Sequence, residues 1–155
     1  SGTIIFESSV PAFEEVKATN NKVTAVLKSD GSIASLALTK AFRFKIALME
    51  EHFNENYIES NKFPKASFSG KIIDFNIRDI SSSDKTYKIK GTLTIRGIKK
   101  EVTIESTIKS ANNIIHIKAG FSVTPEDFNI KIPSIVRKKI AKKVDVSFNF
   151  ELKKR

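Results

Sequence analysis

Apolar and polar residues alternate along much of the chain from residue 64 onward. In residues 143–152, every even position is apolar and every odd position is polar. Residues 86–96 and 101–109 show the same period of two. Successive side chains of a strand point to opposite faces. These runs therefore predict antiparallel strands with one face packed in the core and the other exposed to solvent. We expect Phe148 and Phe150 to point inward.

Short connections that contain Gly or Asn separate the alternating runs, as hairpin turns require. They lie at residues 96–100 and 110–113, and Asp30-Gly31 forms another turn signal. Further strand segments are expected at residues 22–28, 32–39, 42–46, 64–80 and 114–123. About eight strands at this spacing favour a barrel or sandwich over alternating strands and helices, in a single domain covering residues 3–153.

Two stretches depart from the strand period. Ile46, Met49, Phe53 and Tyr57 recur at helical spacing, which predicts a short helix with one apolar face. Near the end of the chain, Pro133-Ser134 precedes a basic stretch, and the serine suits the N-cap of a second helix. The expected architecture is therefore all-β with one or two short helices.

Composition adds a marked charge asymmetry. The net charge is +10, and residues 137–155 carry eight Lys/Arg against two Asp/Glu, or +6. Such a basic end suits a polyanion, an anionic membrane or a phosphorylated ligand, or it keeps the protein soluble. With no cysteine, disulfides and thiolate metal sites are excluded. The chain begins at Ser1 without a methionine, so we expect any export signal to lie outside this sequence.

The predicted helix carries the most conspicuous candidate chemistry. His52 and Glu55 could share a helix face, but a zinc or iron site needs three or four ligands, and the other histidine, His116, lies in a separate strand. No G-x-S-x-G motif marks a hydrolase. We therefore expect no catalytic residues, no metal and no cofactor. The helix is interpreted as a lid whose apolar side docks on the barrel.

Three motifs in order resemble the YceI-like family. They are "MEEHFNENYIESNKFPKASFSGKI", "YKIKGTLTIRGIKKEVTI" and "FSVTPEDFNIKIP". Phe63-Pro64 leads to Phe68 in a strand, and a G-x-L-T-I-x-G hairpin follows. The chain lacks the opening strand with a His-Ser pair, and "TPEDFNI" stands where an Arg-containing turn is common. It resembles a divergent branch, to which the headgroup contacts made by those missing residues do not transfer.

The resemblance implies a lipocalin-like barrel of eight antiparallel strands. Its lumen would hold a long isoprenoid, a quinone-like molecule or a fatty-acyl chain, which the protein carries or stores without catalysis. Members of the family are typically exported bacterial proteins, so we expect a periplasmic or secreted protein. The pattern alone favours a barrel filled by its own side chains, whereas the resemblance favours an open lumen.

Apolar side chains of the strands and of the helix are expected to line the lumen. They are Phe42, Phe44, Met49, Phe53, Phe68, Tyr87, Ile89, Leu93, Ile104, Phe121, Phe148 and Phe150. A second set, which we call the rim cluster, is expected to meet a headgroup or an anionic membrane surface. It consists of Arg137, Lys138, Lys139, Lys142 and Lys143. The alternative function is a basic nucleic-acid-binding barrel, which would need outward aromatic residues among its cations.

Overall fold

The computed structural model describes residues 2–8, 16–130 and 143–153 of the chain. Its strands are β1 (Gly2–Glu7), β2 (Lys17–Leu27), β3 (Ser32–Leu38), β4 (Arg43–Phe44), β5 (Lys65–Ile72), β6 (Lys85–Ile95), β7 (Ile98–Ala111), β8 (Ile114–Val123) and β9 (Val144–Lys153). Its helical segments are η1 (Thr39–Ala41), α1 (Ala47–His52), η2 (Phe53–Tyr57), η3 (Ile77–Asp79) and η4 (Pro125–Phe128).

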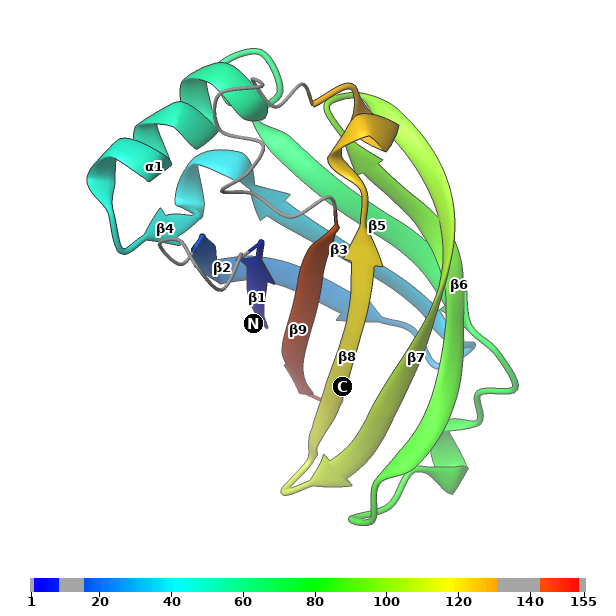
Figure 1. Cartoon of the computed structure of the whole chain (residues 1–155). Helices are drawn as coiled ribbons and strands as arrows, with labels where there is room; N and C mark the ends of the chain where they lie inside the picture. Colours follow the sequence, from blue (N-terminus) through cyan, green and yellow to red (C-terminus); the bar gives the residue numbers. More distant parts are fainter. Residues whose placement is uncertain (1, 9–15, 131–142, 154–155) are drawn as a thin grey trace.

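The strands form one antiparallel sheet that closes on itself (Figure 1). The order is β1-β9-β8-β7-β6-β5-β3-β2, and β2 pairs back with β1. The two-residue β4 adds a short pairing to β2. The predicted eight-stranded antiparallel barrel is therefore confirmed. Closure gives each of the eight barrel strands two neighbours, and only the short β4 pairs on one side.

Backbone geometry at the hairpins follows from their residues. Arg96 and Gly97, between β6 and β7, have φ angles of 53° and 72°. Asn112 and Asn113, between β7 and β8, have φ angles of 54° and 63°. Two successive positive φ values give the turn whose twist matches that of the flanking strands, and Gly and Asn adopt this geometry readily.

The strand count was predicted correctly, but one strand was misplaced. Residues 42–46 were expected to form a full strand, yet only Arg43 and Phe44 pair, because the chain then turns into α1. The strand that completes the barrel is β1, at residues 2–7. Its apolar residues are consecutive (Ile4, Ile5, Phe6), so the segment lacks the alternation that marked the other strands.

The predicted first helix spans α1 and continues directly into the π-helical turn η2. Figure 1 shows this helix at one end of the barrel, beside β4. The end of η2 is marked by the backbone N–H of Ile58, which donates to the carbonyl of Phe53, five residues earlier (2.9 Å). The predicted second helix, beginning at Pro133-Ser134, falls outside the described residues.

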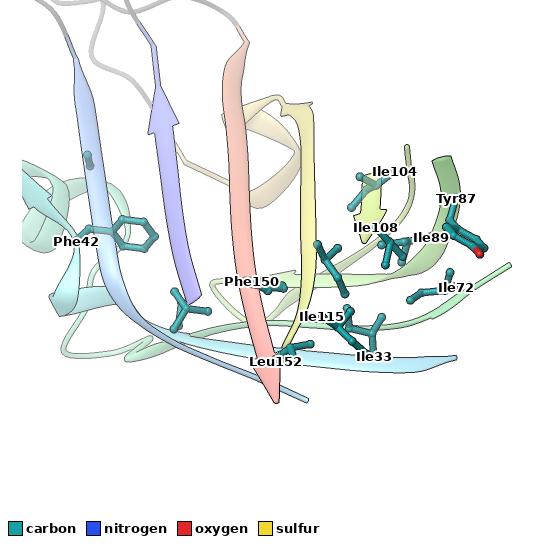
Figure 2. Close-up of a cluster of buried hydrophobic side chains, with 14 of the residues drawn as sticks. Ile33, Phe42, Ile72, Tyr87, Ile89, Ile104, Ile108, Ile115, Phe150 and Leu152 are labelled. Atoms are coloured by element: carbon teal, nitrogen blue, oxygen red, sulfur yellow. The ribbon is translucent and has the colours of Figure 1, made fainter. Parts of the chain in front are cut away.

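The barrel interior follows the predicted alternation. On β9, Phe150 and Leu152 are buried, whereas Ser147 and Asn149 are exposed. Away from the helix, the interior is closed by packed aliphatic side chains, several of which gather in Figure 2. Inside this packed end, the hydroxyl of Ser106 donates to the carbonyl of Tyr87 (3.0 Å), so the buried polar atom is satisfied.

Candidate ligand-binding pocket

The half of the barrel nearest α1 holds an apolar pocket of about 730 Å³. All barrel strands except β2 contribute lining residues. Along β9, the inward residues from Val144 to Phe150 line the pocket in succession, but Leu152, the next inward residue, does not. The barrel is thus hollow at one end and packed at the other. An open lumen and a barrel filled by its own side chains were both considered from the sequence, and the structure has one of these at each end.

The residues expected to line the lumen can now be placed. All of them except Tyr87 line this pocket. Tyr87 points into the barrel as the alternation requires, but it lies in the packed end, where its ring is 6.0 Å from that of Phe75. Ile89, the next inward residue of β6, does line the pocket. The boundary between the hollow and packed ends therefore falls between these two side chains.

The helix forms one wall of the pocket. The apolar stripe recognised in the sequence, Ile46, Met49, Phe53 and Tyr57, lines the pocket as a whole. Leu48 also lines it and is 58% exposed, so the pocket reaches the surface beside α1. The apolar side of the helix therefore faces empty space over part of its area, and does not only dock on a filled core.

A cluster of four phenylalanines anchors this wall. The centroids of the contacting rings lie 5.1–5.8 Å apart. One ring comes from β1, one from β4, one from the residue just before β4, and one from η2. The members are Phe6, Phe42, Phe44 and Phe53. Tilted and edge-on contacts at this spacing are favourable for aromatic rings. Phenylalanine also has no polar atom that needs a partner, so the cluster can border an apolar chain.

Gly91, an inward position of β6, leaves room for a neighbouring aromatic side chain. A Cβ atom at Gly91 would lie 2.6 Å from Cζ of Phe68 and 2.5 Å from the carbonyl oxygen of Ser69. The glycine therefore makes room for the ring of Phe68, which lines the pocket from β5. Space freed on β6 is filled by the protein itself.

The polar side chains that border the pocket are uncharged hydroxyls, a phenol and an imidazole: Ser8, Ser35, Thr39, His52, Tyr57 and Ser67. Among the described residues, no Lys, Arg, Asp or Glu lines it. His52 and Tyr57 line it from the helix, and the hydroxyl of Thr39 is engaged with the carbonyl of Phe63 (2.9 Å). Burial raises the pKa of the Tyr57 phenol, so at neutral pH this group is an uncharged donor.

Sequence reasoning missed several lining residues. Ile4 and Phe6 belong to the unpredicted β1. Phe128 is fully buried in η4, within the "TPEDFNI" motif, which was placed at a turn and not in the lining of the lumen. For β1, the sequence signal that could have indicated a strand was its three consecutive apolar residues. For Phe128, the signal that could have indicated burial was a single aromatic residue in an otherwise polar turn.

Arg96 holds together three segments at the pocket end of the barrel. Its guanidinium donates to the carbonyls of Phe128 (3.0 Å) and Asn129 (2.6 Å) after β8. It also pairs with the carboxylate of Glu59 (2.8 Å), just beyond the helix, and lies over the ring of Phe63. Lys100 adds an ion pair to Asp127.

The rim cluster can be placed only in part. Lys143 is exposed and directly precedes Val144, which lines the pocket. The other four members lie outside the described residues. In the described part of the chain, no group of three or more His, Cys, Asp or Glu side chains could hold a metal ion. None of the helices described has the length and apolar character needed to cross a membrane.

Comparison with known proteins identifies the family. The model of the YceI-like domain matches residues 3–152 of the chain. The chain belongs to the YceI-like family. No curated protein matches this YceI-like chain in sequence. Its resemblance to the family, first drawn from three weak motifs, is thereby confirmed.

Solved structures share the fold of this YceI-like chain at low sequence identity. A polyisoprenoid-binding domain from Saccharophagus degradans has a TM-score of 0.86 at 11% identity, covering 99% of this chain and 94% of its own. BcnA from Burkholderia cenocepacia has a TM-score of 0.80 at 16% identity, with 96% and 95% covered. The Campylobacter jejuni YCEI protein has a TM-score of 0.73 at 14% identity, with 92% and 87% covered.

Proposed function

We propose that this protein binds one long amphiphile in its pocket and carries or stores it without catalysis. The ligand class is a polyisoprenoid, a quinone-like molecule or a fatty-acyl chain. The observation that supports this most strongly is the apolar pocket of about 730 Å³, which falls within the size range of ligand sites. Each methylene buried there contributes about 0.8 kcal/mol, so a long tail needs few polar contacts.

The family supports the same class of ligand. One similar structure is described as a polyisoprenoid-binding domain. In this chain, the phenol of Tyr57 and the imidazole of His52 border the pocket near its opening. They are suited to hydrogen-bond an uncharged polar head, while the tail lies among the aromatic and aliphatic side chains deeper in the barrel.

The nucleic-acid alternative gains no support from the described surface. The large apolar side chains exposed there are aliphatic: Val26, Leu36, Leu38, Leu48 and Ile73. Sequence-independent binding of single strands relies on exposed aromatic rings on which bases stack. A basic surface without such rings is better suited to general electrostatic attraction.

We further propose that the protein acts in the periplasm or as a secreted protein and contacts an anionic membrane briefly during loading. Leu48 at the pocket opening could enter the headgroup region, and the exposed Lys143 lies at the pocket end of β9. Cations near such a surface contribute about 1 kcal/mol each and lose effect as salt rises. Fractionation of the source cells, with detection of the protein by an antibody, tests the compartment: recovery in the periplasmic or secreted fraction is expected, and recovery with the cytoplasmic fraction would contradict the proposal.

Binding is tested with cis-parinaric acid, a fatty acid that fluoresces in apolar surroundings. Ala37 lines the pocket, whereas its neighbour Leu36 on β3 points outward and is 37% exposed. An Ala37→Trp variant places an indole ring inside the pocket, and Leu36→Trp adds the same side chain outside. We expect one tightly bound probe for the unmodified protein and for L36W, and markedly weaker binding by A37W. Equal binding by both variants would place the probe outside the pocket and overturn the proposal.

A further inference from the structure

The pocket ends on a layer of buried side chains that we call the floor. The floor consists of Ile33, Ile89, Ile104 and Phe150, which are all buried and all line the pocket. Beyond it, buried side chains that do not line the pocket fill the barrel, among them Tyr87, Ile108, Ile115, Ile117 and Leu152. Figure 2 shows Ile115 and Leu152 gathered with the floor residue Ile33, far from Phe42 near the helix.

The floor rests on rigid support. Ser106 lies between Ile104 and Ile108 on β7, and its hydroxyl donates a hydrogen bond to the backbone carbonyl of Tyr87 on β6. The ring of Phe150 stacks on that of Phe148 at 4.5 Å, and Gly2 leaves room for it, since a Cβ there would lie 2.5 Å from Cδ1 of Phe150. Close-packed interiors of this kind do not open for a ligand without loss of stability.

The volume above the floor limits what can enter. A water-sized group occupies roughly 30 Å³ in a liquid. The pocket of about 730 Å³ therefore accommodates about 24 non-hydrogen atoms. Along β9, the lining from Val144 to Phe150 extends for about 20 Å at the usual rise of a strand. A fully extended chain of about 24 atoms is longer than this, so a chain that fills the volume lies bent inside the pocket.

We propose that the floor sets an upper limit on chain length: the pocket takes a single acyl or prenyl chain of about 24 non-hydrogen atoms. A longer chain leaves its excess outside, at the opening beside Leu48. This inference rests on the proposed function. It predicts that affinity rises about fourfold with each added methylene until the chain fills the space above the floor, and then stops rising.

The test measures displacement of cis-parinaric acid by saturated fatty acids whose sizes run from half to one and a half times this limit. In the unmodified protein, affinity should reach a plateau near the limit. In Ile104→Ala, which deepens the pocket by three carbon atoms, the plateau should move to longer chains. Ile108→Ala is the matched control, because it removes the same atoms from the same strand below Ser106 and should leave the plateau unchanged.

A filling variant keeps the test independent of the stability of I104A. Ser35 is the next inward residue above Ile33 on β3 and lines the pocket. Ser35→Leu should shift the plateau to shorter chains, whereas Ala34→Leu, on the outer face, should not. Affinity that keeps rising beyond the limit, or a plateau that neither I104A nor S35L moves, would overturn the length limit. Failure of every fatty acid to displace the probe would overturn the proposed function and the limit with it.

Discussion

Replacing Arg96 by methionine should destabilise the protein more than any change on its exposed strand faces. Arg96 directly follows β6 and is the first residue of the β6–β7 turn, and its side chain is only 15% exposed. Its guanidinium joins the loop after the helix, through Glu59, to the backbone that follows η4, through Phe128 and Asn129. Methionine keeps much of the aliphatic part of the side chain that lies over Phe63, and like arginine it is an unbranched residue. The Arg96→Met variant therefore measures the contribution of the guanidinium group to stability.

The contacts give the expected magnitude. Each of the two hydrogen bonds from the charged donor to a carbonyl contributes about 1.5–3 kcal/mol. The ion pair adds about 0.5 kcal/mol, because Glu59 is half exposed. Against this, Nε of Arg96 is buried and has no hydrogen-bond partner among the described residues, which costs about 1–3 kcal/mol. We expect a net loss of about 3 kcal/mol, or a fall in Tm of about 6–12 °C for a chain of this size.

Urea unfolding followed by circular dichroism measures the difference in the free energy of unfolding. Glu59→Gln is the matched control, since it removes the ion pair alone and should cost about 0.5 kcal/mol. If R96M unfolds within 0.5 kcal/mol of the unmodified protein, or if E59Q costs as much as R96M, then the bonds to the two carbonyls do not stabilise the pocket end.

Two further predictions concern the pocket and its rim. In a Tyr87→Phe variant, absorbance titration should show the Tyr57 phenol ionising above its ordinary pKa of about 10, because burial disfavours the phenolate. The neutral phenol of Tyr57 therefore makes its full contribution to stability below pH ~10, and this contribution is lost as the pH rises through the folded-state pKa. A titration midpoint for Tyr57 at or below the ordinary pKa would contradict this prediction. Changing the rim cluster to glutamine should slow transfer of a fluorescent isoprenoid from anionic vesicles at low salt, and equal rates would remove the cluster from loading.

Much of the fold follows from side-chain alternation. On β9, polar residues at odd positions and apolar residues at even positions leave one register for a half-buried strand, and the structure has that register. The turn at Arg96-Gly97 is equally local, because glycine accepts the positive φ that the hairpin requires. By contrast, β1 was missed because Ile4, Ile5 and Phe6 are all apolar although they point alternately in and out.

The pocket could be predicted only in part. Alternation tells which side chains point inward, and it placed Tyr87 and Ile89 on the same face correctly. It carries no information about depth, since the hollow and packed ends are both lined by Ile and Phe. Whether an inward side chain meets a partner or empty space depends on strand tilt and on the helix that covers one end, which are properties of the whole barrel.

A paramagnetic ligand tests the central claim most directly. A fatty acid with a nitroxide near its methyl end broadens the NMR signals of amides that lie close to it. If the tail enters the pocket and stops at the floor, the amides of Ile89, Ile104 and Phe150 should broaden most, and that of Ile108 less. Broadening centred on outward residues such as Val26 and Leu36, with the floor amides unaffected, would contradict binding inside the barrel.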